Sequence, residues 1–122
     1  MINFKKLFRS FSHAFKGIAL VFQEEQNFRI QIFITFAALF AAILFKISKK
    51  EFLFVIISFT QLLVLEIINT AIEKFIDIIK PRVHHYAAII KDIIAAAVFL
   101  SAISTAIIII FIYYPYIQAL LN

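Results

Sequence analysis

The chain has 122 residues and a formal net charge of +5, and 64% of its residues are apolar, against roughly 45–50% in a soluble domain. With a mean hydropathy of +1.01, one Gly and two Pro, the composition excludes a typical water-soluble domain and favours long membrane helices. The absence of Cys excludes disulfides and Cys-based metal sites, and basic residues dispersed among apolar runs argue against a nucleic-acid partner.

The first predicted element is an amphipathic surface helix over residues 1–24. From Phe4 to Ile18 apolar residues recur at steps of three and four, and basic residues fill the opposite side, a pattern that suits a helix lying in the membrane interface. Asn3 is the expected N-cap. Because apolar and basic residues alternate here without a compact apolar core and a small-residue cleavage site, we expect no cleavable signal peptide.

Three membrane-spanning helices are predicted next, over residues 28–45, 52–79 and 93–114. The first is near the short limit for crossing about 30 Å of hydrocarbon. The third is expected to end at Pro115, where the neighbouring tyrosines are predicted to form an aromatic belt at the membrane interface: Tyr113, Tyr114 and Tyr116. The fold class is therefore an all-α integral membrane protein, with residues 1–122 forming a single unit.

Lys and Arg are unevenly distributed between the two sides of these spans. The N-terminal region carries five Lys or Arg residues, and the region around the second loop carries four. The first loop carries three, and the C-terminal tail carries none. Because short loops rich in Lys and Arg stay in the cytoplasm, we expect the N-terminus and the second loop there and the C-terminus outside.

A polar stripe runs along the second predicted span. Glu66, Asn69, Glu73, Asp77 and Lys80 follow a 3-4-4-3 spacing, which places them on one helical face. A carboxylate near the centre of a membrane helix costs about 2.5–3.5 kcal/mol on insertion scales. The stripe must therefore face protein, water or a bound ion rather than lipid.

Two interpretations of this stripe are open. It could be only a hydrogen-bonded seam between helices with a solvated end. Alternatively it is functional: Glu66 and Glu73 lie two turns apart, about 10.5 Å along the axis, and are too distant to bind one ion together. Glu73 is then suited to bind Mg²⁺ beside a nucleotide, and the deeper Glu66 to act as a general base toward a lipid hydroxyl.

Further groups of residues extend this pattern along the chain: Ser10-Phe11-x-His13-Ala14-x-x-Gly17, Glu25-x-Asn27-Phe28-Arg29, Glu66-x-x-Asn69-Thr70-Ala71-Ile72-Glu73-x-x-x-Asp77, His84, and Lys91-Asp92-x-x-Ala95-Ala96-Ala97-Val98. With the three spans and the basic first helix, they resemble the small prokaryotic diacylglycerol kinase family, which also contains undecaprenol kinases. The resemblance covers essentially the whole chain.

The resemblance implies a Mg²⁺-dependent enzyme that transfers the γ-phosphoryl group of ATP to a membrane lipid alcohol. Glu66 would be the catalytic base, Glu25 and Glu73 would bind the metal, and Asn69 and Asp77 would support them. The resemblance also implies a homotrimer in a bacterial inner (cytoplasmic) membrane, with cytoplasmic active sites between subunits. The residues implied to surround the nucleotide are Lys6, His13, Glu25, Glu73, His84, Lys91 and Asp92.

Several positions allow a second interpretation. His85 could replace His84 in a shifted alignment. Lys91 could simply mark a cytoplasmic helix end, with Asp92 in the first turn, where a carboxylate favours the positive end of the helix dipole. Three residues depart from the family pattern and put details of nucleotide contact and helix packing in doubt: Ala88, Ile90 and Ile94.

An active lipid kinase is the first hypothesis, and diacylglycerol and undecaprenol both remain open as its lipid. A non-catalytic membrane scaffold that keeps the fold is the alternative. A transporter or channel subunit is a third, because carboxylates inside membranes also mark ion pathways. Small side chains that would allow close helix packing give weak independent support for assembly: Ala37/Ala41, Ala38/Ala42 and Ala97/Ser101/Thr105.

Overall fold

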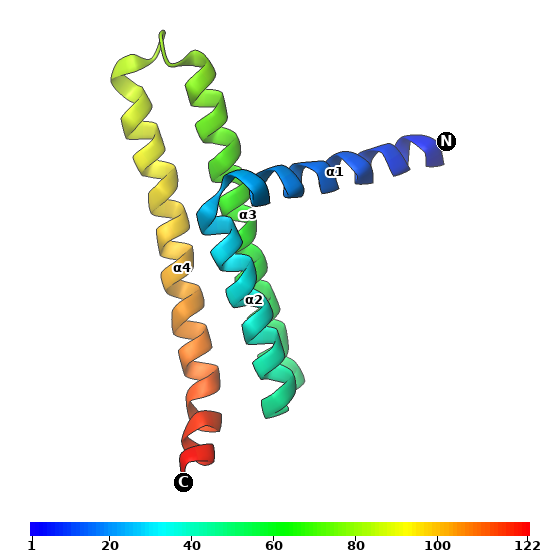
Figure 1. Cartoon of the computed structure of the whole chain (residues 1–122), viewed down its shortest axis with the longest axis vertical. Coiled ribbons are helices and arrows are strands. Elements are labelled where there is room, and N and C mark those ends of the chain that lie inside the picture. The colour runs from blue at the N-terminus through cyan, green and yellow to red at the C-terminus, as the bar shows by residue number, and fades with distance from the viewer.

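The computed structural model describes all 122 residues as four α-helices: α1 (Phe4–Glu24), α2 (Gln26–Phe45), α3 (Lys49–Ile79) and α4 (His84–Leu121). Figure 1 shows α2, α3 and α4 as an elongated bundle, from which α1 leaves at a steep angle as an arm. The three bundle helices are long and apolar enough to cross a membrane, with mean hydropathies of 2.1, 2.1 and 2.7. The predicted all-α fold with three spans is confirmed.

Helix α3 holds the bundle together, because α2 and α4 each pack against it and make little contact with one another. The main apolar cluster joins all three helices: Ala38, Ala42, Val55, Phe59, Ile112 and Tyr113. Only 17 of the 122 residues are buried, so most apolar side chains on the outside of the bundle face the surroundings. This distribution suits a protein whose solvent is lipid.

Four of the small residues on α2 and α4 pack within one chain, whereas Ala37 is exposed and Ala41 and Ala97 are partly buried. Ala38 and Ala42 are buried against α3, and so are Ser101 and Thr105. The Thr105 hydroxyl donates a hydrogen bond to the Ser58 carbonyl of α3 at 3.2 Å, which ties α4 to α3 at close approach. The four buried residues therefore give no support for contacts between subunits, and the trimer stays a prediction.

Helix boundaries differ from the prediction mainly in α4. This helix begins at His84 rather than at residue 93, and it continues through Pro115 to Leu121. Pro115 removes one backbone donor without ending the helix, as is tolerated when neighbouring turns keep their hydrogen bonds. Helix α2 begins at Gln26 rather than at residue 28, and α3 begins at Lys49 rather than at residue 52.

The joint between α1 and α2 is a sharp elbow at Glu25, whose backbone is extended. The Arg29 guanidinium donates to the carbonyls of Phe22 and Gln23, both at 2.8 Å, and so caps the last turn of α1. A cation at a helix C-terminus also interacts favourably with the helix dipole. At the other end of α1 the Asn3 side chain accepts from the Lys6 N–H at 3.2 Å, which confirms the predicted N-cap.

The opposite end of the bundle, which we call the Lys46 end, comprises the α2–α3 turn and the C-terminal turns of α4. Lys46 ends α2 in the left-handed conformation, with φ at 52°. Ser48 and Glu51 then form a capping box at the start of α3, with bonds of 3.2 and 3.0 Å. The Tyr116 hydroxyl donates to the Glu51 carboxylate at 2.6 Å and joins α4 to this cap.

The prediction that Tyr113 belongs to an aromatic belt at the membrane interface is wrong. Its side chain is only 5% exposed, and its hydroxyl donates to the Ala38 carbonyl of α2 at 2.6 Å. Tyr114, the next residue on α4, is 60% exposed. The two differ because neighbouring residues on a helix point in different directions, so only one of them faces the other helices.

Candidate active site

The polar stripe of α3 changes from buried to exposed along its length. Glu66 is 2% exposed and Asn69 is 8% exposed, Glu73 is half-buried, and Asp77 and Lys80 are exposed. The gradient arises because α3, with 31 residues, is longer than α2, with 20, and projects beyond it past the elbow. We call this part of the bundle the α1 end.

Glu66 is held by a residue of α2. The Gln31 amide donates a hydrogen bond to one Glu66 carboxylate oxygen at 3.1 Å. The Thr70 hydroxyl donates to the Glu66 backbone carbonyl at 3.0 Å and leaves the carboxylate free on its other side. Glu66 is therefore a buried carboxylate with one fixed oxygen and one oxygen open to a further donor.

Two buried oxygen atoms beside this carboxylate lack hydrogen-bond partners within the chain: Gln31 Oε1 and Asn69 Oδ1. Leaving a buried polar atom unpaired costs about 1–3 kcal/mol, so most native structures avoid it. These are also the only buried side-chain atoms in the chain left unpaired. Their position next to Glu66 indicates a site built to receive polar groups that the isolated chain does not contain.

Glu25 and Glu73 are two further carboxylates in this part of the bundle. Both lie near enough for their charges to act on the Glu66 carboxyl group. Glu25 forms the elbow itself, next to Glu24, which pairs with Lys74 of α3. No three or more His, Cys, Asp or Glu side chains gather as a complete metal site. Mg²⁺ can nevertheless be held by one or two carboxylates when substrate phosphates and waters supply its other ligands.

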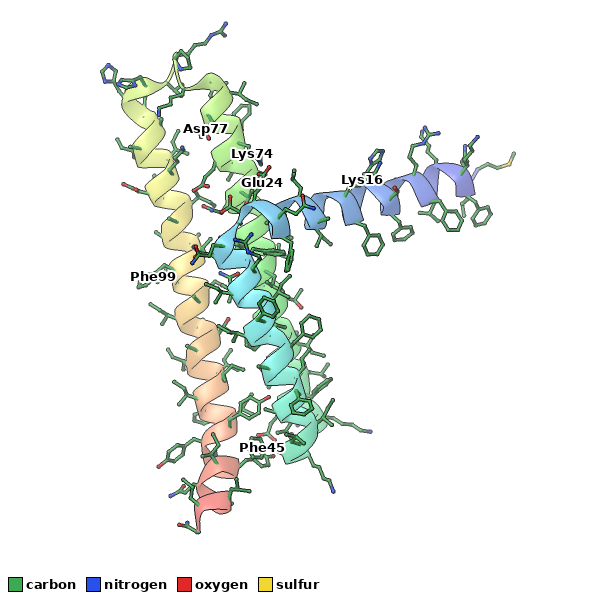
Figure 2. The ribbon with its side chains drawn as sticks, viewed as in Figure 1. Lys16, Glu24, Phe45, Lys74, Asp77 and Phe99 are labelled. Carbon is green, nitrogen blue, oxygen red and sulfur yellow. The ribbon has the colours of Figure 1, made fainter.

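Two ion pairs flank these carboxylates. Lys91 of α4 donates to Asp77 of α3 at 2.7 Å, and the Glu73 charge also acts on Lys91. Lys74 of α3 pairs with Glu24 at the end of α1, as Figure 2 shows where the two helices meet. Both pairs are partly exposed, so they locate the elbow and the start of α4 relative to α3 more than they add stability.

Asp92 and the first histidine of α4 lie on the outside of the α1 end. Asp92 is exposed and makes no ion pair. Because α4 begins at His84, Asp92 is not in the first turn, and the helix-dipole interpretation of this residue is wrong. His84 is exposed, and its ring stacks edge-on with that of His85 at 5.8 Å.

Lys6 and His13, the other residues predicted to bind the nucleotide, lie on the projecting arm α1. Figure 1 shows that this arm leads away from the bundle, and α1 meets the other helices only near the elbow. The structure therefore does not bring Lys6 and His13 to the carboxylates of the same chain.

An apolar groove of about 570 Å³ lies between α2 and α4 and begins at the same glutamine that holds Glu66. Five of its 15 lining residues are alanine, and α3 contributes Phe59 and Leu62. Its last α2 residue is Phe45, which Figure 2 places at the Lys46 end. From Gln31 to Phe45 the groove follows α2 for about 21 Å at 1.5 Å per residue. Its principal lining residues are Gln31, Ile34, Ala37, Ala38, Ala41, Phe45, Ala102, Ala106 and Tyr113.

Residues 12–113 match the family described as "Prokaryotic diacylglycerol kinase". The chain belongs to the prokaryotic diacylglycerol kinase family. The predicted lipid-kinase assignment is thereby confirmed at the level of the family. No solved structure matches the chain.

Two relatives carry different lipid names. The chain is 33% identical over 110 residues to an undecaprenol kinase of Bacillus subtilis, covering 90% of this chain and 89% of the relative. It is also 33% identical over 100 residues to a diacylglycerol kinase of Synechocystis, covering 81% of this chain. The chain spans 57% of the length of that relative. Both are lipid kinases by name, and they differ in the lipid.

Sequence reasoning missed Gln31 and Glu24. Gln31 stands alone in an apolar span, and the cost of burying an unpaired amide was the signal that it had a polar partner in the fold. Glu24 is adjacent to Glu25, which the sequence analysis selected instead. Only the three-dimensional path of the elbow shows that Glu24 is the one that pairs with Lys74.

Proposed function

We propose that this member of the diacylglycerol kinase family transfers the γ-phosphoryl group of ATP to the hydroxyl of a membrane lipid alcohol, with Mg²⁺ as cofactor. The observation that carries the proposal is the buried Glu66 carboxylate, held by Gln31 at the head of an apolar groove. This arrangement offers a base for a hydroxyl and an apolar path for the attached hydrocarbon.

Glu66 takes the proton of the lipid hydroxyl as the alcohol oxygen attacks the γ-phosphorus and the bond to the ADP leaving group breaks. Its position supports this role, because one oxygen is fixed by Gln31 and the other remains available. Gln31 and Asn69 each offer an unpaired oxygen near the reacting group. Phosphoryl transfer depends mainly on alignment and electrostatic stabilisation, so a small set of well-placed side chains suffices.

Glu25 and Glu73 would hold the Mg²⁺, which would neutralise phosphate charge when bound. The support is that these two carboxylates belong to the elbow and to the neighbouring part of α3, and that the charges of both act on Glu66. Lys91 contacts Asp77, which lies one helical turn from Glu73, and it supplies positive charge toward the phosphates while the ion pair with Asp77 positions it. His84 and Asp92 lie on the same side of the bundle and complete the nucleotide contacts of this chain.

The α1 arm lies in the interface of the bacterial inner membrane, with the α1 end of the bundle in the cytoplasm and the C-terminus outside. The exposed apolar residues of α1 support this placement, as does the excess of Lys and Arg at the α1 end. Lys6 and His13 lie too far along the arm to serve their own chain. They therefore reach the nucleotide of a neighbouring chain in a homotrimer.

The proposal is tested by transfer of labelled phosphate from ATP to diacylglycerol and to undecaprenol, each offered separately to the full chain in mixed micelles with Mg²⁺. Labelled lipid is expected from at least one alcohol, and Glu73→Gln should abolish it. Glu24→Gln is the matched control, because it changes a nearby carboxylate that pairs with Lys74 instead. Absence of product from both lipids, with folded protein, would favour a scaffold.

A further inference from the structure

A single side chain bridges the two walls of the apolar groove. Tyr113 projects from α4, lines the groove, and donates its hydroxyl to the Ala38 carbonyl of α2 at 2.6 Å. No other side-chain hydrogen bond in the chain joins α2 to α4. Since these helices make little contact with one another, this bridge fixes their separation along the groove.

The bridge lies in the far half of the groove, toward the Lys46 end. The Tyr113 ring centroid is 6.0 Å from that of Phe45, the last α2 residue of the groove, and on α4 Tyr113 lies about 16.5 Å beyond Ala102, the first α4 residue of the lining. The Tyr113 ring is buried in the apolar cluster with Ala42 and Phe59, so it forms the floor there rather than a plug. The groove ends beside the bridge, at Phe45 and Ile117.

The shape of the groove suits a hydrocarbon chain. Its volume of about 570 Å³ is distributed along about 21 Å of α2, so the groove is elongated and follows the helix axis. An extended hydrocarbon chain has the same shape and matches the apolar lining. The occupant is therefore a flexible apolar chain that starts at Gln31 and reaches Tyr113.

We propose that Tyr113 is a specificity-determining residue that selects lipid alcohols whose chain reaches the far end of the groove. The proposal rests on the proposed lipid-kinase function, because the chain is that of the phosphorylated alcohol. Short chains end before the bridge and do not contact Tyr113. Long chains pack on the Tyr113 ring and depend on the spacing of α2 and α4 that its hydroxyl maintains.

The test compares farnesol as the short alcohol with undecaprenol as the long one, using Tyr113→Phe and Tyr113→Ala in the full chain. Tyr113→Phe keeps the ring and removes the bridge, so it preserves the apolar core. We expect Tyr113→Ala to lower kcat/KM for undecaprenol about tenfold, mainly through KM, and Tyr113→Phe to lower it less. Neither variant should change kcat/KM for farnesol more than about twofold.

Tyr114→Ala is the matched control, because Tyr114 is the neighbouring tyrosine but faces outward. It should leave both alcohols unaffected. Equal losses for short and long alcohols in the Tyr113 variants would show a purely structural role and overturn the proposal. Unchanged values for both would do the same, as expected if a helix of a second copy fills the groove.

Displacement of tritiated undecaprenol from the protein separates this proposal from the catalytic one, because it needs no turnover. Weaker undecaprenol binding in Tyr113→Ala than in Tyr114→Ala supports the role of Tyr113 even if no phosphate is transferred. Equal binding by the wild type and both variants overturns it. Failure of phosphate transfer by the wild type contradicts the lipid-kinase function alone.

Discussion

The two ends of the bundle use polar residues differently. At the Lys46 end the carboxylate of Glu51 accepts from Ser48 and Tyr116, and the Tyr113 hydroxyl is also paired. At the α1 end Glu66 is only partly paired, and the buried oxygens of Gln31 and Asn69 have no partner. A closed set of hydrogen bonds stabilises a fold, whereas unpaired buried oxygens mark the place where another molecule completes the structure.

The largest expected difference between the ends is catalytic. Glu66→Gln should lower phosphate transfer roughly 10²- to 10⁴-fold, because the amide cannot accept the hydroxyl proton. Glu51→Gln, the same chemical change on the same helix at the other end, should leave the turnover number within about twofold. Labelled lipid formed per minute by the two purified variants measures the contrast. Similar losses in both would remove the distinction between the two ends.

The second expected effect concerns the metal. Glu25→Gln should raise the Mg²⁺ concentration for half-maximal activity by at least roughly 10-fold, because one of two carboxylate ligands is lost. Chelation of Mg²⁺ should abolish activity in the wild type. Activity measured over a Mg²⁺ titration provides the test, with Glu24→Gln as the adjacent control. An unchanged Mg²⁺ dependence in Glu25→Gln would contradict the assignment of this ligand.

A smaller loss is expected at Gln31. Gln31→Leu removes the donor that fixes the Glu66 carboxylate, and a loosely oriented base should lower kcat by roughly 10-fold. Gln31→Asn, which keeps an amide on a shorter side chain, should retain more activity. Steady-state kinetics measure kcat and KM separately. A change confined to KM would indicate that Gln31 contacts the lipid without orienting Glu66.

The smallest expected effect is on stability at the Lys46 end. Tyr116→Phe removes the hydrogen bond to Glu51 and should lower the free energy of unfolding by about 1 kcal/mol without affecting turnover. Denaturant titration of the protein in mixed micelles, followed by circular dichroism, measures this change. Tyr114→Phe removes an exposed hydroxyl from the same helix and serves as the control. A loss of turnover in Tyr116→Phe would show that the Lys46 end influences catalysis and would contradict the prediction.

The sequence predicted the helices and the position of the carboxylates, because both follow from periodicity along one chain. Long apolar runs predicted three spans, and the 3-4-4-3 spacing predicted the stripe on α3. The predicted end of the third span was wrong. Pro115 lowers helix stability locally, but the hydrogen bonds of the surrounding turns allow the helix to continue to Leu121. Local rules do not include that compensation.

Contacts between helices could not be predicted from spacing. Tyr113 and Tyr114 are equivalent in the sequence, and only the packing of α4 against α2 shows that one bridges a groove and the other faces outward. The partnership of Gln31 with Glu66 joins residues that are 35 positions apart. Such pairs depend on the rotation of each helix about its axis, which the apolar pattern of α2 does not specify, because this helix is apolar all round.

The most direct test of the central claim is to locate the reacting end of the lipid. A prenol with a photoreactive group beside its hydroxyl is irradiated with the protein in vesicles, and the labelled peptides are identified by mass spectrometry. The account predicts labelling around Gln31 and Glu66, with competition by unlabelled undecaprenol. Labelling around Phe45 and Tyr116 at the Lys46 end would contradict it.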